Sequence, residues 1–186
     1  SFRLGNAMKN GIPVAIVGPV NAGKSTLLNA LLNEDRAIVS DVAGTTRDTI
    51  EETLNIGGIL FRFIDTAGLR DTDEAVENAG IDRSLKKLSE ADAVLAVVDI
   101  AAPADEGIAA LRDIVSKVDF TTQKLVILLN KCSLSADNKN VNLFNNFVSS
   151  LDNKVVMFKI SALEKIGIEA LKKYLSDSFG SLNLRT

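Results

Sequence analysis

The sequence predicts an α/β domain of three layers, in which helices cover both faces of a mostly parallel six-stranded sheet. Two observations predict this class: short β-branched runs alternate with patterns of helical period, and a glycine-rich loop joins the first strand to the first helix. Strands are expected at Val14–Val17, Thr53–Ile56, Ile59–Ile64, Ala93–Asp99, Lys124–Asn130 and Val155–Ile160. Helices are expected at Lys24–Asn33, Ile81–Ala91, Ile108–Val118 and Ile166–Phe179.

One pair of strands is expected to run antiparallel. The short link Asn55-Ile56-Gly57-Gly58 joins two strand-like runs directly, and so short a connection allows only a hairpin. Every other connection is long enough to return the chain for parallel pairing. The polar stretch Ser133–Asn140 is expected to be a surface loop.

Length and composition favour one domain. The chain has 186 residues, of which 46% are hydrophobic and 24% charged, as in ordinary globular proteins. We therefore expect a single domain over residues 1–186, with residues 1–11 as an N-terminal linker segment. Because the chain begins at Ser1 rather than Met, we expect it to be a fragment of a larger protein, with a processed chain as the alternative.

Charge and cysteine content exclude several classes of site. The net charge of −3 argues against broad electrostatic attraction to nucleic acid, so any contact with RNA is expected to need another domain. Cys132 is the only cysteine and the chain has no histidine, which excludes an intramolecular disulfide and disfavours a zinc site. No apolar run is long enough for a membrane span, and a reducing cytoplasm is the expected compartment.

The strongest motif is Gly18-Pro19-Val20-Asn21-Ala22-Gly23-Lys24-Ser25, which matches G-x4-G-K-[ST] between a strand and a helix. Its glycines let backbone N–H groups curl around phosphate oxygens, which predicts a P-loop NTPase. Lys24 is expected to reach the β- and γ-phosphates, and Ser25 to offer its hydroxyl to Mg²⁺. The nucleotide-binding residues predicted here are Asn21, Ala22, Gly23, Lys24, Ser25 and Thr26. The alternative is a glycine-containing turn that precedes Lys-Ser by chance.

Two further motifs are expected to complete the phosphate and Mg²⁺ site. Asp65 ends a predicted strand and begins Asp65-Thr66-Ala67-Gly68, so its carboxylate is predicted to hold Mg²⁺ through water and the Gly68 N–H to meet the γ-phosphate. Within Gly44–Asp48, Thr46 is preferred over Thr45 as a further Mg²⁺ ligand. Both motifs lie at or in long irregular stretches, and such loops are usually functional. Alone, the same residues would be turn or cap residues.

Two pairs of residues are expected to bind the base. Asn130-Lys131 and Ser161-Ala162 each follow a predicted strand, where a purine ring would lie in an open α/β sheet. Asn-Lys alone is a weak signal, and its alternative interpretation is a simple exit from a strand.

In this order and spacing, the five elements resemble GTPases of the translation-factor-related class. Four segments narrow the resemblance to the G domain of the MnmE family of tRNA-modification GTPases: Gly18–Ser25, Ala37–Asp48, Asp65–Arg70 and Val76–Ser84. The Era and Der families share the Thr-Thr-Arg element but normally lack the Glu-x-x-Gly-Ile-x-Arg-Ser pattern of the last segment. Der remains the closest competitor.

The resemblance implies GTP hydrolysis to GDP and phosphate, with K⁺ bound beside the phosphates and a homodimer formed through the switch regions. Asn21 matches the family's K⁺-ligating asparagine, and Ser40 and Val42 match positions that offer it backbone carbonyls. Glu77 falls on the family's glutamate that helps to position the attacking water, so the implied catalytic set is Glu77, Lys24, Thr46 and Gly68. Without the resemblance, Glu77 would be interpreted as a solvated helix-capping carboxylate.

Partners follow from the same resemblance. In a full-length MnmE protein, other domains would bind tRNA and the partner MnmG would share in wobble-uridine modification. One departure concerns the base: the family motif is Asn-Lys-x-Asp, whereas this chain has Asn130-Lys131-Cys132-Ser133. The missing carboxylate puts guanine selectivity in doubt, whereas the Ala162 N–H is still expected to donate to the guanine O6. The alternatives are therefore a Der-type ribosome-assembly GTPase, a nucleotide-dependent switch with little turnover, and an ATP-using P-loop protein.

Overall fold

The computed structural model describes residues 10–32, 50–65, 87–131, 138–151 and 154–184, with the side chains of 50, 51, 65, 138 and 181–184 excepted. Its sheet has the order β2-β3-β1-β4-β5-β6, in which all pairs but β2–β3 are parallel. The strands are β1 (Ile12–Val17), β2 (Ile50–Ile56), β3 (Ile59–Asp65), β4 (Ala93–Asp99), β5 (Lys124–Asn130) and β6 (Val156–Lys159). The predicted α/β class, with six strands and one antiparallel pair, is confirmed.

The β2–β3 hairpin closes at the predicted glycine link. Gly57 and Gly58 have φ angles of 61° and 87°, and the Gly58 N–H donates to Asn55 Oδ1 at 3.0 Å. Two successive residues with positive φ match the right-handed twist of the flanking strands, which is why glycine is favoured in such a turn. In the hairpin, Ile56 lies opposite Ile59 and the pairing runs to Ile50 opposite Asp65.

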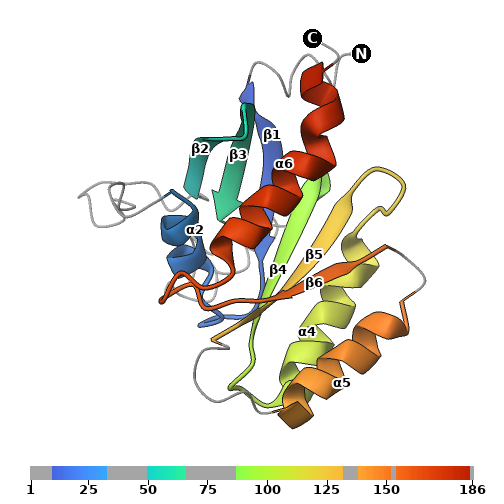
Figure 1. The fold of residues 1–186 in the computed structure, drawn as a ribbon. Coiled ribbons are helices and arrows are strands. Elements are labelled where there is room, and N and C mark those ends of the chain that lie inside the picture. The colour runs from blue at the N-terminus through green and yellow to red at the C-terminus, as the bar shows by residue number, and fades with distance from the viewer. Residues whose placement is uncertain (1–9, 33–49, 66–86, 132–137, 152–153, 185–186) are drawn as a thin grey trace, which may run out of the picture.

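Side-chain alternation in the strands builds one core on each face of the sheet. Along β4, Ala93, Leu95 and Val97 join the core beneath α2 (Lys24–Leu32) and α6 (Ile168–Leu184). Val94, Ala96 and Val98 join the core beneath α4 (Ala104–Lys117) and α5 (Asn138–Ser149). Both faces of β4 are thus buried, as expected of a central parallel strand. Figure 1 shows α6 crossing the front of the sheet, and α4 and α5 running next to each other.

The helix α5 corrects the sequence prediction. A surface loop was expected over Ser133–Asn140 and no helix beyond it, yet Asn138–Ser149 is helical. Its asparagine-rich sequence has low helix propensity, but Val141, Phe144 and Phe147 recur on one face and are buried against the sheet. Burial of this apolar face outweighs the propensity of the exposed asparagines.

Two other helices differ at their starts. The helix α4 begins at Ala104, ahead of the predicted Ile108, because Pro103 occupies the N-cap and Asp105 and Glu106 lie in its first turn. Of the predicted helix Ile81–Ala91, residues 87–90 are helical, Ala91 lies just beyond the helix, and the part up to residue 86 lies outside the described residues. The helix α6 starts at Ile168 because Ile166 pairs with Ser161 in an isolated bridge.

Candidate functional site

The glycine-rich loop leaves β1, which lies between β3 and β4 in the sheet. The helix that follows β1, α2, covers one face of the sheet, and the helix that follows β4, α4, covers the other. Open α/β sheets bind their ligands at such a point, beyond the carboxyl ends of the strands. Within the loop, Gly18 and Gly23 have φ angles of 150° and 101°. A Cβ on Gly18 would lie 2.2 Å from the Val97 carbonyl oxygen, and one on Gly23 would lie 2.2 Å from Asn130 Nδ2. Only glycine fits either position.

Lys24 is the first residue of α2, and its side chain is held against the loop. The residue is buried, with a relative exposure of 7%. Its ammonium group donates to the carbonyl oxygens of Gly18 and Pro19, at 2.5 and 3.0 Å. The loop thus surrounds a cation at the positive end of a helix that has no acidic residue in its first turn. Ser25 and Thr26 follow Lys24 and are half-buried. The arrangement is suited to a phosphate chain.

Asn130, the last residue of β5, ties three loops together. Its Nδ2 group donates to the Ala22 carbonyl at 2.8 Å, and its Oδ1 accepts from the Ala162 N–H at 3.0 Å. The side chain is buried, with a relative exposure of 2%. Because both ends of this amide are used, Asn130 fixes the P-loop relative to the loop that follows β6. The sequence predicted that Asn130 binds the purine base, and the structure shows in addition that it binds the backbone of the P-loop.

The neighbouring Lys131 extends the same connection. Its Nζ donates to the Asn21 carbonyl at 3.1 Å and forms an ion pair with Asp99 Oδ2 at 2.8 Å. Asp99 ends β4 and lies opposite Asn130 in the register of β4 and β5. Sequence reasoning missed Asp99, although its position at the end of a buried strand is the signal that singled out Asp65.

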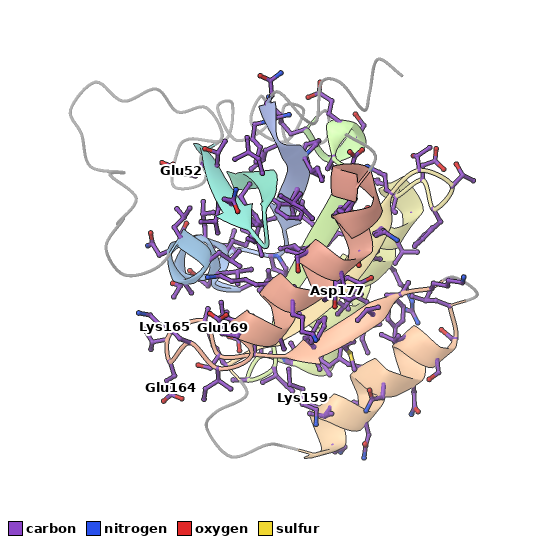
Figure 2. All side chains as sticks on the ribbon, turned by 45° about the horizontal axis from the view of Figure 1, so that its top comes forward. Glu52, Lys159, Glu164, Lys165, Glu169 and Asp177 are labelled. Carbon is purple, nitrogen blue, oxygen red and sulfur yellow. The ribbon has the colours of Figure 1, made fainter. Side chains whose placement is uncertain are left out.

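The loop after β6 is closed by its own hydrogen bonds. Ser161 and Ile166 exchange two backbone hydrogen bonds, at 3.0 and 2.9 Å, and Ser161 Oγ accepts from the Glu164 N–H at 3.2 Å. The predicted Ala162 donor is present at this edge but is directed at Asn130, so a contact with a base oxygen would need a shared hydrogen bond. Figure 2 shows Glu164 and Lys165 near the first turn of α6.

The structure brings the described members of the predicted site to one edge of the sheet: Asn21, Ala22, Gly23, Lys24, Ser25, Thr26, Asn130, Lys131, Ser161 and Ala162. The backbone of Asp65 ends β3 at the same edge, opposite Ile16 of β1. The predicted site residues Ser40, Val42, Thr46, Gly68 and Glu77 lie outside the described residues, as does Ser133.

The residues present fit Mg²⁺. Ser25 lies in the first turn of α2, and Asp65 ends the strand adjacent to the one that leads into the P-loop. Hydroxyl and carboxylate oxygens are the ligands that Mg²⁺ takes in nucleotide sites, together with phosphate oxygens. For K⁺, the only described candidate is Asn21, an exposed residue of the P-loop with a left-handed backbone.

A phosphate-binding loop at the switch point of a parallel sheet, tied by a buried asparagine to the end of β5, defines a P-loop nucleotide-binding domain. The protein family described as 50S ribosome-binding GTPase matches residues 13–131. The chain belongs to this GTPase family.

Among curated proteins, the chain is similar to tRNA modification GTPases named MnmE. It is 49% identical over 178 residues to MnmE of Porphyromonas gingivalis, covering 95% of this chain and 37% of that protein. It is 54% identical over 134 residues to MnmE of Parabacteroides distasonis, covering 72% of this chain and 29% of that protein. The chain therefore spans well under half the length of these relatives.

Among solved structures, the chain is similar to Era. It matches Era in complex with MgGDPNP and part of 16S ribosomal RNA, with a TM-score of 0.68 and 26% identity over 87% of this chain and 54% of that chain. An Era variant of Aquifex aeolicus bound to GDP·AlF4⁻ matches with a TM-score of 0.66 and the same identity, over 87% of this chain and 55% of that chain.

In the described residues, no helix is long and apolar enough to cross a membrane.

Proposed function

We propose that the chain hydrolyses GTP to GDP and phosphate, as the G domain of an MnmE-type tRNA-modification GTPase. The observation that carries the proposal is the amide of Asn130, which links the phosphate-binding loop to the predicted base edge at Ala162. Asn130 would thus connect the loops proposed to bind the phosphates and the base of one nucleotide. Membership of the GTPase family and 46–54% identity to MnmE relatives support the guanine nucleotide over other ligands.

The chemistry asked of this chain is positioning and charge neutralisation. Phosphoryl transfer passes through a loose transition state, so donors that are already oriented lower its barrier more than a strong base does. Lys24 and the P-loop N–H groups would bind the phosphate oxygens, and Glu77 would orient the attacking water. Ser25, Thr46 and Asp65 would hold Mg²⁺, which when bound supplies positive charge to the β- and γ-phosphates.

The proposal includes a dependence on K⁺ and a homodimer formed through the switch regions. Asn21, Ser40 and Val42 would be the chain's ligands to K⁺, and similarity to MnmE supports this set. Asn21 is well placed, because its carbonyl is fixed by Lys131 on one side of the loop while the residue itself is exposed.

Because the chain covers 37% of the length of its Porphyromonas gingivalis relative, tRNA modification is proposed for a larger protein of which this chain is one domain. There, tRNA would bind to other domains and MnmG would be the partner, in the cytoplasm. The G domain would supply the nucleotide-driven change of conformation.

The test is multiple-turnover phosphate release from GTP in K⁺ and in Na⁺ at equal ionic strength. We expect turnover to rise at least about tenfold in K⁺, because a cage of fixed size and ligand number discriminates between the two ions. GDP with aluminium fluoride should dimerise the chain in K⁺ only. Asn21→Ala should remove both responses. Equal rates in the two salts would reject the cation mechanism, and negligible turnover in both would favour a switch without catalysis.

Glu77→Ala separates hydrolysis from binding in the same assay. We expect turnover to fall about a hundredfold while GDP affinity stays within about twofold, because the side chain aligns water and does not touch the nucleotide. Equal losses of turnover and affinity would mark Glu77 as a structural residue.

A further inference from the structure

Two residues with left-handed backbones meet between the P-loop and the end of β5. Asn21 and Lys131 have φ angles of 67° and 71°, in the left-handed region that residues with a Cβ rarely adopt, asparagine more readily than lysine. Lys131 Nζ donates to the carbonyl oxygen of Asn21, at 3.1 Å. The Lys131 side chain therefore connects the two residues that have the uncommon backbone conformation. Such conformations persist only where neighbouring groups hold them, so the Lys131 side chain itself needs a partner that orders it.

Asp99 is the group that holds it. Its Oδ1 accepts from the Ala101 N–H at 2.8 Å, which fixes the orientation of the carboxylate, and its Oδ2 is 2.8 Å from Lys131 Nζ. The side chain of Asp99 is only 21% exposed, whereas that of Lys131 is 43% exposed. The Asp99 carboxylate is therefore fixed in place, and it orders the longer and more exposed side chain of Lys131.

Asn130 and Lys131, at the end of β5, bind the carbonyl groups of two consecutive peptides of the P-loop. Asn130 binds the Ala22 carbonyl, and Lys131 binds the Asn21 carbonyl. A trans peptide is planar, so directing the Ala22 carbonyl at Asn130 turns the Gly23 N–H to the opposite side. The Ala22 N–H, which belongs to the same peptide as the Asn21 carbonyl, donates to Pro19 at 3.2 Å and closes the turn of the loop. Together these bonds set the directions of the P-loop amides.

We propose that Asp99 is a positioning residue for nucleotide binding, which acts through Lys131 to hold the P-loop at Asn21 in the conformation that accepts phosphate. Asp99 binds no nucleotide itself. The inference requires nucleotide binding by the P-loop and is independent of the K⁺ dependence proposed above.

The test is the rate of GDP dissociation, measured with a fluorescent GDP analogue and Mg²⁺ in Na⁺ buffer so that the cation mechanism does not enter. Asp99→Asn keeps an acceptor for the Ala101 N–H but removes the charge that orders Lys131. We expect dissociation to accelerate about three- to tenfold. The matched control is Asp113→Asn, which breaks an exposed ion pair with Lys117 in α4 and should leave the rate unchanged.

A double-mutant cycle decides whether Asp99 acts through Lys131. Lys131→Met should accelerate GDP dissociation by itself, and adding Asp99→Asn to it should cause no further change. Asp99→Ser, whose hydroxyl can also accept from the Ala101 N–H, provides a second variant if Asp99→Asn folds poorly. An unchanged dissociation rate in folded Asp99 variants, or an effect of Asp99→Asn that persists in full beside Lys131→Met, would overturn the proposal.

Discussion

The two ends of β5 carry the same kind of side chain in different surroundings. Gln123, just before the strand, is buried, and its amide donates to the carbonyls of Leu88 and Ala91 and accepts from the Asp119 N–H. Asn130, at the other end, is also buried and binds two backbone groups in distant loops. A buried and satisfied amide is therefore not by itself a sign of function.

What distinguishes the carboxyl end is its backbone. In the described part of the chain, the non-glycine residues with positive φ are Asn21, Lys131 and Lys165, and all three lie in loops at that end. The Gly18 and Gly23 positions, which exclude any Cβ, lie there as well. Unfavourable backbone conformations persist only where the surrounding structure imposes them, and they gather at ligand sites. We infer that Gln123 serves stability and Asn130 serves nucleotide binding.

The largest effect is expected from Lys24→Ala, at the functional end. The change removes the ammonium group that would bind phosphate oxygens, so GDP and GTP affinity should fall at least about a hundredfold. The fold should persist, because the buried charge is replaced by a small apolar side chain. Equilibrium binding and circular dichroism check the two parts. A folded variant with parental affinity would contradict the assignment of phosphate binding to the P-loop.

Gln123→Ala probes the opposite end. It would leave the carbonyls of Leu88 and Ala91 and the Asp119 N–H without this partner, so the free energy of unfolding should fall by about 2–3 kcal/mol. GDP affinity of the folded fraction should stay within about twofold. Urea denaturation and GDP titration measure both. A large loss of affinity at unchanged stability would reverse the roles assigned to the two ends.

Asn130→Ala should have the converse profile. Loss of the bonds to Ala22 and Ala162 separates the P-loop from the loop after β6 and leaves Lys131 as its remaining described link to the end of β5, so GDP affinity should fall about ten- to thirtyfold. Comparing GDP titrations of this variant and Gln123→Ala shows which amide the nucleotide depends on. If Asn130→Ala binds GDP with parental affinity, nucleotide binding does not depend on the Asn130 side chain at the end of β5.

The smallest effect, a gain, is expected from Ser133→Asp. Restoring the carboxylate of Asn-Lys-x-Asp would add a charge-assisted contact to the N1–H and amino group of guanine, and should raise the preference for GDP over ADP about tenfold. Competition binding with GDP and ADP measures the ratio in both proteins. An unchanged ratio would place base selectivity outside this position.

Much of the fold could be predicted from the sequence because its signals are local. The continuous apolar runs of β4 and β5 gave the bounds of both strands, and Gly57-Gly58 gave the hairpin. The helix α5 was missed because its asparagines obscured the spacing of Val141, Phe144 and Phe147, and only burial against the sheet makes that face decisive.

The site was predictable to the extent that its residues form contiguous motifs. Lys24, Asn130 and Ala162 were predicted in this way, and the structure places all three at the same edge of the sheet. Asp99 was missed because its partner Lys131 is distant in the sequence: the end of a buried strand marks Asp99 as a candidate, but the flanking residues do not indicate this contact. Pairing of β4 with β5 is what places Asp99 beside Lys131.

The comparison of the two ends is tested most directly by thermal unfolding of the parent, Gln123→Ala and Asn130→Ala, each with and without GDP and Mg²⁺. A ligand at a hundred times its dissociation constant stabilises the folded state by about 2.7 kcal/mol. At one GDP concentration, set to that value for the parent, Gln123→Ala should unfold at a lower temperature yet gain the full increment from GDP. Asn130→Ala should gain much less. A full increment in Asn130→Ala, or its loss in Gln123→Ala, would contradict the assignment of nucleotide binding to the carboxyl end of β5.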